Sequence, residues 1–128
     1  MIRRSPGATG SKAEWIAALH LQSLGLQIIA QNFRTKAGEI DLIARHDDTV
    51  VFVEVRYRRA AEYGLPVETI SATKRRRIVR AAAHYLTTLV TIPNCRFDVI
   101  TLIGDTPTSE ACEWIQGAFD TSDSLWRG

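Results

Sequence analysis

The sequence predicts a mixed α/β fold, in which a central mixed sheet of four to five strands is flanked by helices. Its 128 residues are 45% hydrophobic and 23% charged, a composition typical of one globular domain. Stretches with helical and strand-like periodicity follow one another in the order α-β-β-β-α-β-β. A helix between two strands is the usual link between parallel neighbours. We therefore expect a single domain over residues 1–128.

The first half of the chain predicts a helix followed by an antiparallel meander. Residues 1–10 are polar and are expected to be flexible. The helix begins with a capping box from Ser11 to Glu14 and stops at Gly25. Its apolar stripe consists of Ala17, Ala18, Leu21 and Leu24. Three strands follow, separated by turns at 36–38 and 46–49, and we place them at 27–34, 39–45 and 50–58.

The second half predicts one long helix and further strands. Ser71 caps this helix, which runs to about Val90. Its apolar side consists of Ile78, Ala82, Tyr85, Leu86 and Leu89. Strands are expected at 96–103 and 113–116, and about 118–128 is expected to be flexible. The helical crossover should make the strand at 96–103 parallel to one of the first three.

Charge is distributed unevenly along the chain. Between Arg56 and Arg80 there are eight basic residues and two acids, whereas six acids and one base follow from Asp98 onward. A basic cluster beside an acidic pocket suits a protein that binds a phosphate backbone, although a solvated helix face and an acidic tail are the alternative. Asp98 itself is expected to pair with Arg96, Arg34 or a helix end, or to join a metal site.

The sequence favours a cytoplasmic protein without a membrane partner. It contains no apolar run near 18 residues, which a membrane-spanning helix requires. The first residues lack the apolar segment of a signal peptide. Cys95 and Cys112 lack the spacing of a zinc site and are expected to be reduced.

Asp41 and Glu54 are the most informative acids, because the predicted hairpin should bring them together. If the turn at 46–49 has two or four residues, the register places them directly opposite each other on one face of the sheet. The same register pairs Glu39 with Arg56 and Ile43 with Phe52. Opposed side chains are about 5 Å apart, where two like charges repel by roughly 3 kcal/mol.

This repulsion must be offset by another charge or by a proton. Because apolar residues surround both acids in sequence, a hard cation such as Mg²⁺ or Mn²⁺, which prefers oxygen ligands, is one solution. Alternatively, one acid pairs with Arg56 or Arg34 and the other reaches solvent at a sheet edge. The residue types by themselves leave both explanations open.

The residues around the two acids resemble the core of PD-(D/E)XK nucleases, which include type II restriction enzymes and archaeal Holliday-junction resolvases. The resemblance rests on Gly38–Ala44 (GEIDLIA) and Val51–Arg56 (VFVEVR). Nearly the whole chain also resembles the YraN family of small uncharacterised bacterial proteins. That resemblance includes Gly10–Glu14, Asn32–Arg34, Lys74 and Arg96–Val99. Both resemblances imply a restriction-endonuclease-like fold.

The resemblance implies a role for each matching residue. Asp41 and Glu54, together with the Val55 carbonyl, would hold Mg²⁺ or Mn²⁺. Glu14 corresponds to an acid on the first helix of resolvase-like members. Arg56 stands where the superfamily has a lysine that orients or activates the attacking water. Because Arg remains protonated, it can stabilise charge on a phosphate but cannot act as a base.

Lys74 and Glu14 each allow a second explanation. Lys74 lies one turn before Ile78, so that its stem can point to the sheet and compensate for the missing lysine, or it simply extends along the helix start to solvent. Glu14 shares the inward stripe of its helix but also fits the capping box. The predicted catalytic residues are Asp41, Glu54, Arg56, Glu14 and Lys74.

We expect a divalent-metal-dependent, nuclease-like protein that binds DNA, in preference to RNA, or a structured nucleic acid and hydrolyses phosphodiester bonds. The backbone phosphates would be held by a basic set that consists of Arg58, Arg59, Lys74, Arg75, Arg76, Arg77 and Arg80. Two alternatives remain: a nucleic-acid-binding module with a degenerate, inactive site, and an adaptor that uses the fold to bind a protein. The resolvase-like resemblance is compatible with a homodimer.

Overall fold

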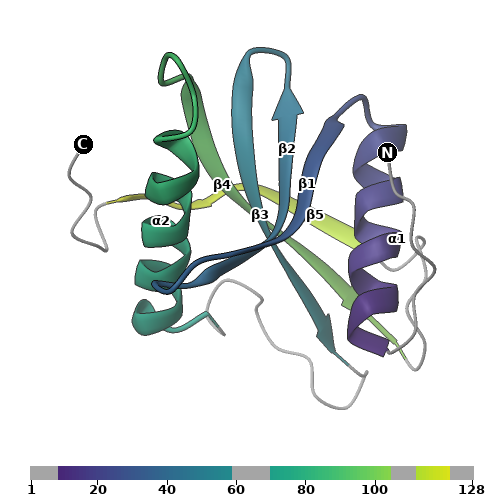
Figure 1. Ribbon diagram of the computed structural model, residues 1–128. Helices are drawn as coiled ribbons and strands as arrows, with labels where there is room; N and C mark the ends of the chain where they lie inside the picture. Colours follow the sequence, from purple (N-terminus) through teal and green to yellow (C-terminus); the bar gives the residue numbers. More distant parts are fainter. Residues whose placement is uncertain (1–8, 59–69, 105–111, 122–128) are drawn as a thin grey trace.

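The computed structural model describes residues 9–58, 70–104 and 112–121, which form a five-stranded sheet between two helices. Figure 1 shows α1 (Thr9–Ser23) and α2 (Ala72–Leu86) on opposite sides of the sheet. In sheet order, the strands are β1 (Gln27–Arg34), β2 (Glu39–His46), β3 (Thr49–Arg58), β4 (Asn94–Ile103) and β5 (Cys112–Phe119). The predicted mixed α/β fold and its order α-β-β-β-α-β-β are confirmed.

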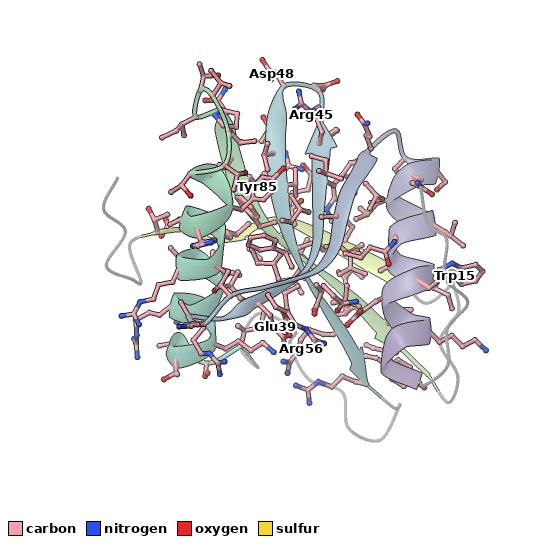
Figure 2. The ribbon with its side chains drawn as sticks, viewed as in Figure 1. Trp15, Glu39, Arg45, Asp48, Arg56 and Tyr85 are labelled. Atoms are coloured by element: carbon pink, nitrogen blue, oxygen red, sulfur yellow. The ribbon has the colours of Figure 1, made fainter. Side chains whose placement is uncertain are left out.

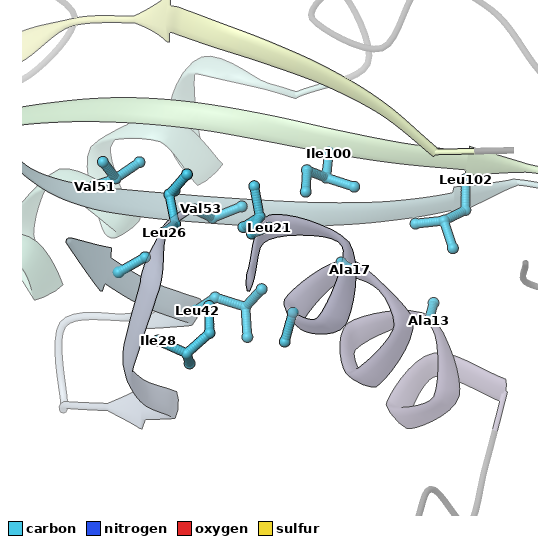
Figure 3. Packing of buried hydrophobic residues seen from close by; sticks show 12 residues of the cluster. Ala13, Ala17, Leu21, Leu26, Ile28, Leu42, Val51, Val53, Ile100 and Leu102 are labelled. Carbon is cyan, nitrogen blue, oxygen red and sulfur yellow. The ribbon is translucent and has the colours of Figure 1, made fainter. Parts of the chain in front are cut away.

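A hydrophobic core lies on each face of the sheet. The α1-side core, seen from close by in Figure 3, includes Ala17 and Leu21 of the helix and Leu42, Val53 and Ile100 of the strands. The α2-side core consists mainly of Ile40, Ile43, Val50, Phe52, Ile78, Val79, Ala81, Ala82, Leu86 and Phe97. The two cores take alternate residues of the central strands, as expected for a sheet that is covered on both faces.

Helix α1 differs from its prediction at both ends. It begins at Thr9, so the expected capping box at Ser11 falls inside the helix. Of the segment that we expected to be flexible, residues 9 and 10 are helical and residues 1–8 lie outside the described ranges. Leu24, which we expected in the apolar stripe, is 48% exposed. The helix ends at Ser23, and the chain turns away at Gly25, whose φ is +97°.

Strands β1, β2 and β3 form the predicted antiparallel meander. A two-residue turn of Asp47 and Asp48 joins β2 to β3 and fixes their register. Asp47 has a φ of +57°, which a short polar side chain tolerates. Ile43 lies opposite Phe52, as the hairpin register predicts.

Helix α2 is the crossover that makes β3 and β4 parallel, as expected. Ser71 caps it, because its side-chain oxygen accepts a hydrogen bond from the backbone N–H of Lys74. The helix ends at Leu86 and not near Val90. The hydroxyls of Thr87 and Thr88 donate to the carbonyls of His84 and Tyr85 and thereby close the last turn. Of the predicted apolar side, Tyr85 and Leu89 lie at the border of the α2-side core.

A buried carboxylate fastens the edge strand β5 to β4. Asp98 is 0% exposed, and it accepts two hydrogen bonds from Arg96, one from Trp114 Nε1 and one from the backbone N–H of Gly117. The expected pairing of Asp98 with Arg96 is therefore confirmed. Strand β5 runs past the predicted 113–116 to Phe119, so 118 and 119, expected to be flexible, are in a strand, and 122–128 lie outside the described residues.

Neither helix in the described ranges is long and apolar enough to cross a membrane.

Candidate functional site

The site begins with a paired irregularity in β1 and β2. In a regular strand, residues three apart lie on opposite faces. Yet Ala30 and Phe33 of β1 both pack with the α2-side core, and so do Ile40 and Ile43 of β2. Each strand must therefore contain one position that breaks the alternation between these two residues.

The breaking positions are Asn32 in β1 and Asp41 in β2. Asn32 has a φ of +53°, far from the strand conformation. It lies across from Asp41, because the pairs Gln31–Leu42 and Phe33–Ile40 flank the two residues. At this point of the sheet, neither the Asn32 nor the Asp41 side chain is part of the hydrophobic core on either face.

Asp41 does not simply lie opposite Glu54, as the sequence predicts. The predicted register holds up to the pair of Leu42 and Val53, where the described ladder of β2 and β3 ends. Beyond that point, the Asp41 Oδ2 atom accepts a hydrogen bond of 2.8 Å from the backbone N–H of Val55. Glu39 pairs with Arg34 of β1, at 3.2 Å, and not with Arg56. The Asp41 carboxylate therefore bonds to the backbone of β3 just beyond the last described pair of the two strands.

Glu54 points to the α2 side, where two cations reach it. Its side chain is 4% exposed, and its Oε2 atom lies 3.1 Å from Lys74 Nζ and 3.8 Å from Arg56 Nη1. Lys74 is thus directed at the sheet, as the first of its two explanations requires. Arg56, in the position of the superfamily lysine, is the more distant partner. Figure 2 shows Arg56 and Glu39 at the end of the sheet between the helices, opposite the end with Arg45 and Asp48.

The α1 side contributes Glu14, whose carboxyl is hydrogen-bonded to Asp41 and to the Asn32 side chain. The Asp41 carboxyl is also hydrogen-bonded to Glu54. Asp41 therefore lies between an acid from helix α1 and an acid from strand β3. The capping-box explanation of Glu14 is wrong, because the helix begins upstream of Ser11.

These residues line a cleft of about 620 Å³ that is open to solvent. Its lining consists of Glu14, Asp41, Glu54, Val55, Arg56, Tyr57, Arg58 and Lys74. All five predicted catalytic residues and the predicted metal-ligand position Val55 therefore meet in one cleft.

The hairpin of β1 and β2 holds helix α2 beside this cleft. Thr35 closes the hairpin turn, since its hydroxyl accepts hydrogen bonds from the backbone N–H groups of Ala37 and Gly38. Gly38 lies directly against the backbone of Arg77, and a Cβ at position 38 would collide with the Arg77 carbonyl. A glycine is therefore required where the hairpin meets the helix that carries Lys74.

Burial raises the pKa of each of the three carboxyls in the cleft, and repulsion from Asp41 adds to the shift in Glu14 and Glu54. Burial, and then repulsion from Asp41, raises the pKa of Glu54 to about 8, although Lys74 opposes the shift. The same two causes raise the pKa of Glu14 to about 7, against a hydrogen bond from Asn32. Burial also raises the pKa of Asp41, which hydrogen bonds from Val55 and Glu54 hold down. Without a cation, the cleft therefore retains a proton at neutral pH.

The oxygen atoms that these residues offer are of the kind that hard divalent cations prefer. Carboxylate oxygens and a backbone carbonyl are the ligands that Mg²⁺ and Mn²⁺ prefer, and burial leaves these acids short of positive charge. As the side chains are placed, no group of three or more His, Cys, Asp or Glu within the described ranges could hold a metal ion. The Lys74 ammonium contacts Glu54 Oε2, so a lysine already balances part of the charge of this carboxyl.

The predicted basic set is divided by the structure. Arg58 and Lys74 line the cleft, and Arg77 and Arg80 are exposed on α2. Two others are engaged in local contacts: Arg75 Nη1 donates to the Ile70 carbonyl at 2.6 Å, and Arg76 donates to the Thr73 hydroxyl at 3.3 Å. Arg59 lies outside the described residues.

Two further residues at the site were not assigned to it from the sequence. Tyr57 packs with the α1-side core, but it also lines the cleft and donates to the Gly104 carbonyl at 2.7 Å. Asn32 contacts Glu14 although it lies in a strand. The one available signal was an Asn within a strand-like run, since Asn tolerates left-handed backbone better than its neighbours do.

Comparison with known proteins identifies a family. Residues 13–102, most of the described chain and all of the predicted catalytic residues, match the uncharacterised protein family UPF0102. The chain belongs to the UPF0102 family. This confirms the resemblance to YraN, which is the same family.

Relatives in UPF0102 match the chain over most of its length. The chain is similar to a UPF0102 protein of Cupriavidus taiwanensis, with 47% identity over 88% of this chain and 83% of the relative. A UPF0102 protein of Paracidovorax citrulli is 50% identical over the same shares. For one of Nitrosomonas europaea, the identity is 45% over 92% of this chain and 98% of the relative.

Proposed function

We propose that this UPF0102 protein is a divalent-metal-dependent nuclease that binds DNA or a structured nucleic acid and hydrolyses phosphodiester bonds. One observation carries the proposal. Three carboxyls from α1, β2 and β3 converge in an open cleft, and a lysine from α2 reaches the most buried of them at 3.1 Å. Converging acids with raised pKa values are typical of sites that bind a cation or transfer protons.

In this proposal, Asp41, Glu54 and the Val55 carbonyl hold Mg²⁺ or Mn²⁺. The bound cation would supply a Lewis acid for the scissile phosphate and would make a bound water more acidic. The hydrogen bond from Val55 N–H fixes one oxygen of Asp41, and the same carboxyl contacts Glu14 and Glu54, which brings the three acids together at the proposed cation position. Glu14 would add a third carboxylate from the α1 side, and its pKa of about 7 suits a group that accepts a proton from water near neutral pH.

Lys74 supports the proposal because it supplies the lysine that is missing from β3. Its Nζ atom approaches the same Glu54 oxygen as Arg56, but more closely. If a cation took the place of Lys74 at Glu54, the ammonium would be available to donate to a phosphate oxygen in the cleft. Arg56 and Lys74 together stabilise the negative charge that develops in the transition state.

The nucleic-acid backbone follows the basic wall of the cleft. Arg58 and Lys74 lie at the cleft, and Arg77 and Arg80 continue the positive charge along α2. Phosphate contacts by such residues give binding that weakens steeply as salt rises.

A cleavage panel tests this function. Plasmid, single-stranded and four-way-junction DNA, with RNA counterparts, are incubated with Mn²⁺ and the wild-type protein, Asp41→Asn or Asp48→Asn. Asp48 is an exposed acid in the β2–β3 turn, at the far end of the sheet, and its variant is the matched control. We expect wild type and Asp48→Asn to cleave and Asp41→Asn to be inactive. Equal product from all three proteins contradicts the proposed site.

A nucleic-acid-binding module with an inactive site is the second candidate. The presence of Arg56 in place of the superfamily lysine favours it, because Arg cannot accept a proton. Salt-dependent binding without any Mn²⁺-dependent product, at every pH between 6 and 9, would support this candidate. Binding that does not depend on salt would contradict both and favour a protein-binding adaptor.

A further inference from the structure

Asn32 adopts an unfavourable backbone conformation in the middle of a strand. Its φ is +53°, whereas the other described non-glycine residue with positive φ, Asp47, lies in a tight turn. The left-handed region is costly for residues with a Cβ, although Asn is among those that tolerate it best. Such strained positions in native proteins are concentrated at functional sites.

The conformation has two consequences for the cleft. It turns Phe33 onto the α2-side core, where the Phe33 and Tyr85 rings meet edge to face with centroids 5.5 Å apart. It also frees the Asn32 side chain, which is exposed and lies across from Asp41, to donate to the Glu14 carboxyl. The backbone requirement alone would be met better by glycine, which has no penalty at positive φ.

The Asn32 side chain therefore contributes something that the backbone conformation alone does not require. Glu14 lies beside Asp41 and is repelled by it. Glu14 is half-buried at the border of the cleft, so it could swing outward to water unless another group held it. The Asn32 amide comes from a third element, β1, and contacts Glu14 from the side of the sheet.

We infer that Asn32 is a positioning residue, which holds the Glu14 carboxylate against Asp41 and thereby adds an acid from α1 to the cation site. This inference rests on the proposed function, since it assigns Asn32 to the same site. Partners of this kind, which orient a metal ligand without touching the metal, typically change metal affinity by 10- to 100-fold when they are removed.

Two glycine variants test the role. Asn32→Gly removes the amide and keeps the backbone conformation, and Asp47→Gly makes the same backbone change at the far end of β2. Calorimetry with Mn²⁺ should show about tenfold weaker binding for Asn32→Gly and unchanged binding for Asp47→Gly. Both variants should resist urea at least as well as wild type. Equal Mn²⁺ affinity in Asn32→Gly and wild type overturns the inference, and so does a loss of urea resistance in Asn32→Gly alone.

A second measurement does not depend on metal. In the NMR spectrum of the metal-free protein, one side-chain amide proton of Asn32 should exchange slowly with solvent, and Glu14→Ala should abolish this protection. Asn94, exposed at the start of β4, is the internal control, because its side-chain protons should exchange rapidly in both proteins. If wild type does not bind Mn²⁺, the proposed metal site fails, but this measurement still decides whether Asn32 holds Glu14. If Glu14→Ala does not change the exchange rate of the Asn32 side-chain amide protons, the inference is refuted.

Discussion

Replacing Glu54 with Gln should stabilise the metal-free protein at neutral pH and leave its stability nearly unchanged at pH 4. The Glu54 side chain is 4% exposed and lies beside the Asp41 carboxyl, and these two causes raise its pKa to about 8. Because the pKa in the folded state lies above that in the unfolded state, folding favours the protonated form. The wild-type protein is therefore most stable below about pH 4.5 and loses stability as the pH rises toward 8.

The size of the effect follows from the shift. At pH 7, an unfolded chain with an ordinary Glu54 has released its proton, whereas the folded protein still holds it. One pKa unit corresponds to about 1.4 kcal/mol, so the wild type loses about 3 kcal/mol between pH 4.5 and pH 7 through this group. Gln cannot ionise and avoids the loss. For a chain of this length, the melting temperature should rise by roughly 10 °C at pH 7.

Urea unfolding and thermal melting at pH 4, 5, 6, 7 and 8, in the presence of a chelator, measure this difference. Asp98→Asn is a suitable contrast, because Asp98 is also buried but receives hydrogen bonds from Arg96, Trp114 and Gly117. Asp98→Asn should lose about 3 kcal/mol or more near neutral pH, because it leaves Arg96 without its anion. If the stability of Glu54→Gln and of wild type falls in parallel between pH 5 and 8, the account of Glu54 is refuted.

Three further predictions concern the same cleft. Mn²⁺ at one fixed concentration, one hundred times its Kd at pH 8, should raise the free energy of unfolding by about 3 kcal/mol at pH 8 and by less at pH 5, and Asp41→Asn should abolish the gain; an equal gain at both pH values contradicts it. Lys74→Ala should lower the cleavage rate by about tenfold or more, with Lys74→Arg less affected, and wild-type rates in Lys74→Ala would exclude Lys74 from the chemistry. Gly38→Ala should cost about 1–3 kcal/mol in urea unfolding, because its Cβ collides with Arg77, and unchanged stability would be inconsistent with this packing.

The sequence predicted the fold well because its signals are local. Alternating apolar residues, a two-residue turn and the Ser71 cap each act over a few positions, and they define the meander and the crossover helix. The end of α2 was missed because Tyr85 and Leu89 continue the apolar pattern. Directly after Leu86, the hydroxyls of Thr87 and Thr88 bond to the carbonyls of His84 and Tyr85, and apolar periodicity carries no information about such contacts.

The sequence predicted which residues form the candidate site but not how they are arranged. Register arithmetic brought Asp41 close to Glu54, because the turn between β2 and β3 fixes their pairing. It could not show that the ladder ends at Leu42 and that Asp41 binds the Val55 amide. Asp41 lies across from Asn32, whose positive φ interrupts β1, and irregularities of this kind arise from packing between strands and not from either sequence alone.

The acids of the cleft come from chain segments that meet only in the complete tertiary structure. An isolated β2–β3 hairpin would carry Asp41 and Glu54, but it would lack Glu14 from α1 and Lys74 from α2. During synthesis on the ribosome, α2, which contributes Lys74, emerges after both β-strand acids. Strand β4, the parallel neighbour of β3 to which α2 leads, emerges later still. The cleft can therefore assemble only after α2 has been synthesised, and a chain truncated before Lys74 lacks one of its walls.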